Sequence, residues 1–225
     1  MPKIKPAKMG ELSRLLKNYY IPDIGRLLRD LLYTKLFFPS QVRLVRQPAY
    51  IVGMRYIKFG EDFRSGPNLR LEVLDSEFVR HEIPVGAGKP ELLIGDGVSL
   101  NFNVHIGVVS SVVLGSNVLI GSNVLITDHN HGSYKGEQQD TPHSLAKERK
   151  LSSEDVIIDD NTWIGENVVI LPGTRIGKGS IVGANSVVSG VFEDHIILAG
   201  TPARAIKKFD AILGEWVSIS ENVYK

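Results

Sequence analysis

The chain has 225 residues, which is enough for one or two domains. Apolar residues make up 43% of it, an ordinary share for a globular protein, and cysteine is absent, which excludes disulfides, thiolate metal sites and acyl-cysteine intermediates. The formal net charge of +1 argues against a nucleic-acid-binding protein, so we expect no nucleic-acid partner.

The charge is unevenly distributed along the chain. Residues 1–50 hold ten Lys or Arg and three Asp or Glu, so this segment carries +7 and the remainder carries −6. Charged residues interrupt every apolar run near the N-terminus, and we therefore expect neither a signal peptide nor a membrane-spanning helix. These features predict a cytoplasmic protein.

Two helices are expected before the first strand. The stretch from Glu11 to Tyr20 is compatible with a short helix, and Ile24 to Phe37 has apolar residues at helical spacing. The other side of the second helix carries Arg26, Arg29 and Lys35. Two interpretations stay open: this helix closes one end of the following domain, or it lies peripherally on an anionic membrane. Residues 1–40 form this basic helical segment.

Repeats of six residues dominate the rest of the chain. The stretch from Val42 to Ile57 predicts strands that lead into an irregular first coil, and Arg80 to Pro90 predicts a loop. An aliphatic residue then opens each six from Ile94 to His131, and the pattern returns from Ile158 to Gly190. A period of six fits neither a helix nor an alternating strand, but it fits a parallel β-helix whose coils stack into a triangular prism. We therefore expect a mainly β fold.

The period is interrupted between the two blocks and fades after the second. Residues 132–155 are polar and show no period, and a loop of this length in a compact domain is a functional candidate. We expect it to be a lid, with a surface decoration as the alternative. The stretch from Ile206 to Val217 predicts a short C-terminal helix. The β-helix domain is accordingly placed at residues 41–205, and a helix or tail at 206–225.

Five stretches carry a more specific signal. They are Ile126–Gly132, with the sequence Asp-His-Asn-His-Gly at its end, Trp163–Val168, Leu171–Thr174, Val182–Val188 and Ala199–Ala203. These motifs resemble those of the hexapeptide-repeat acyltransferases with a left-handed β-helix, most closely the O-acetyltransferases of O-antigen and capsule assembly. The resemblance implies a homotrimer, acetyl-CoA as acyl donor, and a small-molecule or lipid-linked sugar as acceptor.

The resemblance also implies which residues act on the acceptor. A neutral imidazole can take a proton from an alcohol that attacks a thioester, and the family histidine at the position of His129 is that general base. Trp163 matches a family tryptophan near catalysis and is expected to stack on a sugar or cofactor, with anchoring of the lid as the alternative. The residues expected to bind the acceptor are Asn101, Asp128, Asn130 and His131. For Asn101 the alternative is a left-handed corner asparagine; His105 and His143 are weaker candidates.

A second set matches the family groove for acetyl-CoA. Gly165, Ala184, Ser189 and Gly190 fall on that groove, and Arg204 with Lys207 is placed near the cofactor phosphates, with a solvated basic tail as the alternative. Many family members have Thr-Lys where this chain has Ser189-Gly190, so one phosphate contact of the family is missing here.

These residues predict a sugar O-acetyltransferase of surface-polysaccharide biosynthesis that transfers acetyl directly and needs no metal. The nearest alternative is N-acetylation of an amino sugar on the same scaffold. A γ-class carbonic anhydrase shares the prism, but it requires a histidine five residues after His129, where Tyr134 stands. A non-catalytic β-helix scaffold is the third alternative.

Overall fold

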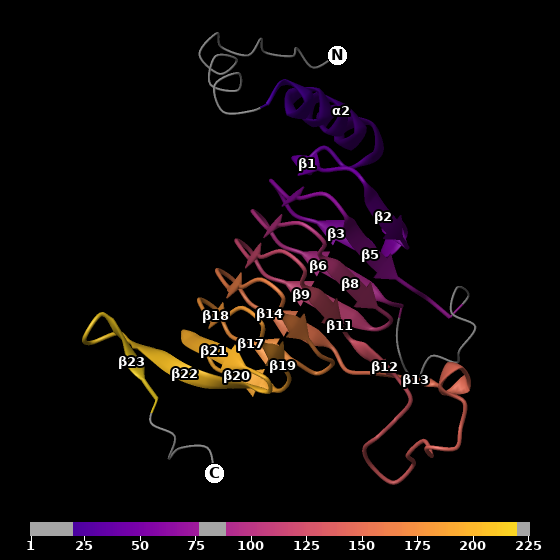
Figure 1. Cartoon of the computed structure of the whole chain (residues 1–225), viewed down its shortest axis with the longest axis vertical. Coiled ribbons are helices and arrows are strands. Elements are labelled where there is room, and N and C mark those ends of the chain that lie inside the picture. Colours follow the sequence, from indigo (N-terminus) through magenta and orange to yellow (C-terminus); the bar gives the residue numbers. More distant parts are fainter. Residues whose placement is uncertain (1–19, 77–88, 220–225) are drawn as a thin grey trace.

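The computed structural model describes residues 20–76 and 89–219. These residues form an α-helix at the N-terminal end of a long triangular prism of parallel strands, with a hairpin at the other end (Figure 1). The helix expected from Glu11 to Tyr20 and most of the loop expected from Arg80 to Pro90 lie outside the described residues.

Three sheets form the faces of the prism, and successive strands of the chain visit them in turn. Sheet A contains β1 (Leu44–Val45), β4 (Arg64–Ser65), β7 (Ser99–Leu100), β10 (Leu119–Ile120), β15 (Trp163–Ile164), β18 (Ile181–Val182) and β21 (Ile196–Gly200). Sheet B contains β2 (Ala49–Val52), β5 (Leu69–Val73), β8 (His105–Val108), β11 (Leu125–Thr127), β16 (Val169–Ile170) and β19 (Val187–Val188). Sheet C contains β3 (Ile57–Phe59), β6 (Glu91–Ile94), β9 (Ser111–Leu114), β14 (Val156–Ile158), β17 (Arg175–Ile176) and β20 (Val191–Phe192).

The core is the stack of aliphatic residues that open the sixes. Ile120, Ile126, Ile158, Ile164 and Ile170 are all fully buried inside the prism. Each pairs with its counterpart one coil away, as Ile164 does with Val182. Burial of one such side chain contributes roughly 1.5–3 kcal/mol, so the repeated stack fixes the register of every strand. The parallel β-helix predicted from the period is confirmed.

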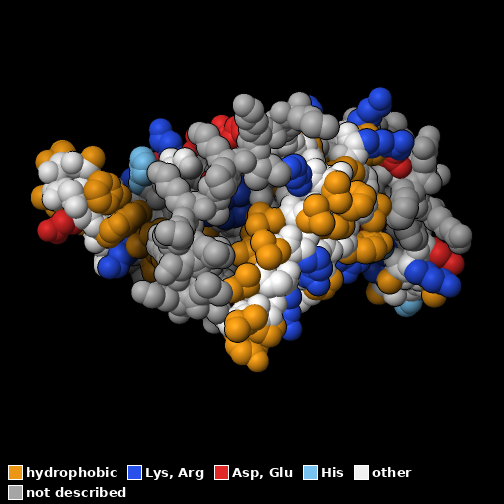
Figure 2. Space-filling view, turned by 90° about the horizontal axis from the view of Figure 1, so that it is seen from above, with side chains coloured by type: hydrophobic (Ala, Val, Ile, Leu, Met, Phe, Trp, Pro, Cys, Tyr) orange, Lys and Arg blue, Asp and Glu red, His pale blue; other side chains and the backbone are white. Residues whose placement is uncertain are grey.

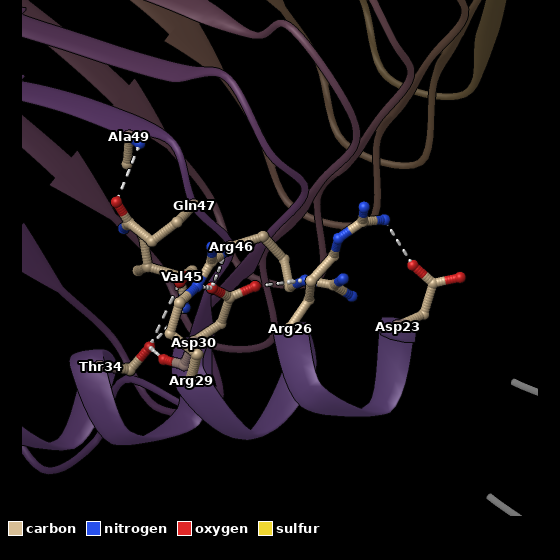
Figure 3. A network of polar contacts seen from close by, with 9 residues as sticks. All are labelled: Asp23, Arg26, Arg29, Asp30, Thr34, Val45, Arg46, Gln47 and Ala49. Atoms are coloured by element: carbon tan, nitrogen blue, oxygen red, sulfur yellow. Dashed lines mark hydrogen bonds and ion pairs between the residues drawn. The ribbon is translucent and has the colours of Figure 1, made fainter. Parts of the chain in front are cut away.

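The helix α2 (Ile21–Phe37) lies across the N-terminal end of the prism (Figure 1). It starts three residues earlier than expected, because Pro22 falls in its first turn, where a missing N–H costs nothing. The residues it buries completely are polar. Figure 3 shows that Asp30 accepts from Arg46 Nε at 2.8 Å and that the Thr34 hydroxyl accepts from the Val45 amide at 2.8 Å. Polar contacts therefore fix the helix on the first coil.

The opposite side of α2 is apolar and exposed. Leu28, Leu32 and Leu36 are 61%, 59% and 65% exposed. Seen from above in Figure 2, hydrophobic side chains and Lys or Arg side chains lie side by side at this end of the molecule. No helix in the described part of the chain is long and apolar enough to cross a membrane. The apolar stripe predicted from helical spacing thus faces away from the prism.

The corner between sheets A and B is regular after its first turn, which contains the cis peptide bond Gln47–Pro48. Each later turn places an asparagine in the left-handed region, and their side chains form a ladder in which Asn68 donates to Asn103 at 2.7 Å and Asn167 donates to Asn185 at 3.2 Å. A short polar side chain tolerates this conformation better than most residues do. The left-handed residue of its turn is Asn103, and Asn101 does not share that conformation.

The corner between sheets B and C is interrupted twice. The chain leaves it after β5 and again after β11, and returns to sheet C at β6 and β14. The second excursion contains β12 (His129–His131), β13 (Leu151–Ser153) and a 3-10 turn at Ala146–Glu148. The pairing of β12 with β13 is antiparallel and ties the two ends of the excursion together. The excursion therefore begins at the predicted base, three residues before the boundary expected from sequence.

The C-terminal helix predicted from Ile206 to Val217 is wrong. This region forms β22 (Ala203–Asp210) and β23 (Glu215–Ser218), which extend sheet A as an antiparallel hairpin. Gly214 adopts φ +70° in the connecting turn, and Phe209 packs edge-on against its cross-strand partner Trp216 with ring centroids 5.4 Å apart. Phe209 and Trp216, whose spacing along the chain also fits one face of a helix, therefore meet across a tight turn.

Candidate active site

His129 is the second residue after β11 and the first of β12, and it adjoins the buried carboxylate of Asp128. Its Nδ1 lies 2.9 Å from Asp128 Oδ1 and 3.2 Å from the Thr127 hydroxyl. The side chain of His129 is 19% exposed, whereas that of Asp128 is fully buried. Strand alternation explains the arrangement, because Ile126 and Asp128 point into the prism while Thr127 and His129 point out.

Asp128 is held by backbone donors from the adjacent coil. Its carboxylate accepts from the amide of Val109 at 3.0 Å and from the amide of Ser110 at 2.7 Å. All these contacts lie beneath His129, where the carboxylate has no exposed surface. The assignment of Asp128 as an acceptor-binding residue is therefore wrong for this chain, because burial keeps its oxygens away from any ligand.

The surroundings of Asp128 fix the tautomer of the neighbouring imidazole. An ionised carboxylate only accepts hydrogen bonds, so Nδ1 of His129 is the donor in this contact. The neutral ring then carries its lone pair on Nε2, directed away from Asp128. This is the protonation pattern that a general base requires.

A second histidine lies on the outer face of sheet B, near the first. His105 Nε2 is 2.9 Å from Glu72 Oε2, and Glu72 also accepts from Arg70 Nε at 2.8 Å. Burial lowers the pKa of His105, against the opposing effect of the Glu72 contact. Burial acts to raise the pKa of Glu72, but hydrogen bonds from Arg70 and His105 outweigh it and hold that pKa below its usual range. Sequence reasoning gave His105 little weight and did not identify Glu72, whose signal is strand register alone.

Residues at both ends of the excursion line a cavity of about 210 Å³. His129 itself is not part of this lining. Asn130 lines the cavity together with Ser189, so a residue expected at the acceptor and one expected at the cofactor meet there. His131, the last residue of β12, is exposed, and its carbonyl accepts from the Tyr134 hydroxyl. His143 is exposed farther along the excursion.

A larger cavity of about 310 Å³ continues toward the C-terminal end of the prism. Ser189 lines both cavities, and Gly190 and Arg204 line the second. Its remaining lining includes the apolar Val191, Phe192 and Ile196. Three of the residues expected to bind acetyl-CoA are thus brought together in a partly apolar cleft with one guanidinium at its edge.

The hairpin places the two expected phosphate ligands on one side of a strand. The pairing of β21 with β22 shifts register between Ile197 and Leu198, so that Lys207 pairs with Ile197 and Arg204 pairs with Ala199. The shift leaves Ile206 out of the ladder, as in a β-bulge. Because the bulge adds one residue, side chains three apart, those of Arg204 and Lys207, fall on the same side.

The other predicted site residues lie on a different edge of the prism. Trp163 is on the outer face of sheet A, paired with Leu119 and Ile181 and 51% exposed. Asn101, Gly165 and Ala184 are in turns of the corner between sheets A and B. His129, by contrast, lies at the corner between sheets B and C, where the excursion begins. Within a single chain Trp163 and His129 therefore belong to different faces of the prism, and the expected role of Trp163 near catalysis stays a prediction.

The described residues contain no group of three or more His, Asp or Glu side chains arranged to hold a metal ion.

Comparison with known proteins adds family evidence to this geometry. Residues 155–190 match the family model for bacterial transferase hexapeptide (six repeats). A protein of Escherichia coli (strain K12) that carries the provisional name lipopolysaccharide biosynthesis O-acetyl transferase WbbJ is 41% identical over 200 residues, covering 88% of this chain and 95% of that protein. The galactoside O-acetyltransferase of Lactococcus lactis is 26% identical over 184 residues, covering 78% of this chain and 84% of that protein.

A solved structure supports the fold. A variant of AntD, an N-acyltransferase from Bacillus cereus in complex with dTDP-4-amino-4,6-dideoxyglucose and coenzyme A, superposes with a TM-score of 0.60 at 20% identity, over 77% of this chain and 84% of that chain. The architecture is the left-handed parallel β-helix that the family resemblance implied.

Proposed function

The chain belongs to the bacterial hexapeptide-repeat transferases, and from this premise we propose that it transfers an acetyl group from acetyl-CoA to a sugar hydroxyl in the biosynthesis of a surface polysaccharide. The observation that carries the proposal is the contact of 2.9 Å between His129 and the buried Asp128. That contact leaves Nε2 of a partly exposed imidazole ready to accept a proton. The similarity to WbbJ supports a lipopolysaccharide-type acceptor.

The proposed reaction is a direct transfer. Bound acetyl-CoA supplies a thioester carbonyl. His129 Nε2 takes the proton of the acceptor hydroxyl while the hydroxyl oxygen forms a bond to that carbonyl carbon. The carbon–sulfur bond then breaks, and the imidazolium of His129 returns the proton to the sulfur. The 225 residues include no cysteine to carry a thioester intermediate, which supports direct transfer. Asp128 holds the ring orientation and stabilises the imidazolium.

The cleft from Asn130 through Ser189 to Arg204 is the proposed path of the donor. Its apolar lining at Val191 and Phe192 suits the pantetheine arm, and Arg204 with Lys207 offers cations to the phosphates. In this arrangement Asn130 and His131 lie at the acceptor end, and the excursion at 132–155 acts as the lid.

We propose further that the active unit is a homotrimer with sites between neighbours. The predicted residues fall into two groups on different edges of one prism, His129 with Ser189 and Gly190 on one edge, and Asn101, Trp163, Gly165 and Ala184 on the other. A closed ring of three copies brings one edge of each prism against the other edge of its neighbour. Such a ring joins both groups in one site.

N-acetylation of an amino sugar is the second candidate. The observation that favours it is the shared fold with an N-acyltransferase, although fold alone does not select between an oxygen and a nitrogen nucleophile. Incubation of the protein with labelled acetyl-CoA and a panel of glycosides and amino sugars separates the two. An ester product loses its label in mild base, and an amide product retains it. Transfer only to amino groups contradicts the O-acetyl proposal.

The exposed face of α2 supports a peripheral contact with an anionic membrane. Leu28, Leu32 and Leu36 present acyl-compatible surface, and the basic N-terminal segment carries +7 over residues 1–50. Apolar burial and attraction to anionic headgroups act together in such helices. This contact would bring the enzyme to a lipid-linked acceptor.

A further inference from the structure

The cluster of Arg70, Glu72 and His105 lies beside the proposed base and has no part in the reaction described above. All three residues are on the outer face of sheet B, on strands β5 and β8. Strand register pairs Glu72 with Gly107, and Gly107 in turn with Thr127, two residues before His129. The cluster and the base therefore share one surface, separated by the position of Gly107.

Gly107 keeps the space between the two imidazoles open. A Cβ atom at this position would lie 3.3 Å from His129 Cε1 and 3.8 Å from His105 Nε2. Both distances are measured from the same Cβ position, so the distance between His129 Cε1 and His105 Nε2 cannot exceed the sum of these two distances. Gly107 does not have the positive φ that favours glycine, so its backbone does not require it. The absence of a side chain at Gly107 leaves space between the rings of His105 and His129.

The contacts of His105 orient its ring. Glu72 accepts from Arg70 Nε at 2.8 Å and lies 2.9 Å from His105 Nε2. As a carboxylate, Glu72 fixes Nε2 as the donor, and the lone pair of the neutral ring is then on Nδ1. The side chain of His105 is 33% exposed and that of Glu72 is 16% exposed. The charged carboxylate of Glu72 and the Nε2 side of the oriented His105 ring thus lie next to Gly107 and the space beside His129.

We propose that His105 and Glu72 form a second wall of the acceptor site and hydrogen-bond a hydroxyl next to the one that His129 deprotonates. The ligand class is a sugar with hydroxyls on adjacent carbons. Two fixed groups on either side of Gly107 suit two neighbouring hydroxyls, one directed to Nε2 of His129 and the other to the hydrogen-bonded pair of His105 and Glu72. Hydrogen bonds to a charged group and its oriented partner are stronger than neutral ones. This inference rests on the proposed sugar acetyltransferase activity.

The test compares acceptors that have or lack single hydroxyls. Methyl galactoside, methyl glucoside, methyl mannoside and methyl rhamnoside are first assayed with acetyl-CoA, and the best acceptor is then compared with its monodeoxy analogues. Removal of the hydroxyl next to the acetylated one is expected to lower kcat/KM of the wild-type enzyme by roughly 10- to 100-fold. His105→Leu and Glu72→Gln should cause a similar loss with the full acceptor and little further loss with that deoxy analogue.

Controls and opposite outcomes separate this inference from the function on which it rests. Glu91→Gln removes a carboxylate that is paired with Lys58 on sheet C, and it should behave as wild type. His105→Gln keeps a side-chain acceptor and should recover part of the loss. If wild type acetylates a glycoside but His105→Leu lowers kcat/KM equally for full and deoxy acceptors, or not at all, the second wall is refuted alone. If no glycoside is acetylated, the proposed function fails and this inference falls with it.

Discussion

Asp128 and His129 are adjacent in sequence but lie on opposite sides of the prism wall, with the carboxylate buried and the imidazole 19% exposed. Three donors converge on that carboxylate, the amides of Val109 and Ser110 and Nδ1 of His129. A buried charge is tolerated only when it is hydrogen-bonded in this way. The histidine is thus oriented by a group that the substrate never touches.

Replacement of the proposed base should remove turnover without removing the donor. His129→Ala is expected to lower kcat by roughly 10²–10⁴, because the attacking hydroxyl then loses its proton acceptor. The affinity for acetyl-CoA, measured by calorimetry, should stay nearly unchanged. His131→Ala should be milder, since only one imidazole occupies the base position. A more damaging His131→Ala beside a nearly active His129→Ala would place the base on the wrong residue.

Asp128→Asn should impair catalysis through the tautomer. The amide group of asparagine either faces a backbone donor or donates to Nδ1 of His129, and the latter shifts the ring proton to Nε2. We expect a fall in kcat of roughly 10²–10⁴, as when an orienting carboxylate is lost from a triad. Asp128→Ala should in addition lower the free energy of unfolding, by about 1–3 kcal/mol for each amide left unpaired. Thermal unfolding and kcat measured on both variants provide the check, and full turnover in Asp128→Asn would refute the orienting role.

The sequence contained enough information for the prism. A period of six determines which aliphatic residue is buried in every coil, and Ile120, Ile126 and Ile164 lie inside as the period requires. The turns follow the same period, because asparagine tolerates the left-handed conformation found at Asn123 and Asn167, but from sequence that conformation was considered only for Asn101, which does not adopt it. Local patterns were sufficient wherever the partner of a residue is its own counterpart in the next coil.

Local patterns were insufficient where long-range partners decide. The spacing of leucines predicts an apolar side of α2 but does not show whether that side packs on the prism. In the structure the polar side packs there, because Asp30 accepts from Arg46 and Thr34 accepts from the Val45 amide. The spacing of Phe209 and Trp216 fits a helix as well as a hairpin, and sheet A provided an edge for the hairpin. The burial of Asp128 follows from strand alternation, continued one residue beyond β11.

Stability should fall in mild acid in part through His105. The pKa of His105 is lowered in the folded state, mainly by burial, so the unfolded chain binds the proton more readily. The stability that depends on neutral His105 is therefore complete above the usual histidine pKa and is lost as the pH falls below that value. The lowered pKa of Glu72 adds a loss in the same direction at lower pH. Between about pH 7 and pH 5 the melting temperature of wild type should fall more steeply than that of His105→Gln.

The matched control for this titration is His143→Gln. His143 is exposed in the excursion, so its replacement removes one histidine without touching the cluster of Arg70, Glu72 and His105. Parallel curves for His105→Gln and wild type would show that the folded state does not disfavour protonation of His105.

Membrane contact through α2 is tested by reversing the character of its exposed face. Leu28→Glu with Leu32→Glu should abolish flotation with anionic vesicles, because two charges replace apolar surface that is about 60% exposed. Binding of the unchanged protein should also weaken with salt. Ile212→Glu with Leu213→Glu is the control, since these residues are 96% and 64% exposed on the hairpin turn at the other end. Equal flotation of all three proteins, or none at low salt, argues against the membrane contact.

The division of the site between two copies can be tested by mixing inactive variants. Trp163→Ala should harm acceptor use more than donor binding, because stacking on a sugar needs an aromatic plane. If His129 and Trp163 of one site come from different copies, co-expression of His129→Ala with Trp163→Ala produces trimers in which about a quarter of the sites carry both native residues. Their activity should exceed that of either variant alone. Co-expression of His129→Ala with Asp128→Ala should restore nothing, because those residues belong to one edge of one chain. A stable monomer in sedimentation, or no recovery in the first mixture when mixed trimers are isolated by two tags, would place the whole site on a single chain and refute the shared one.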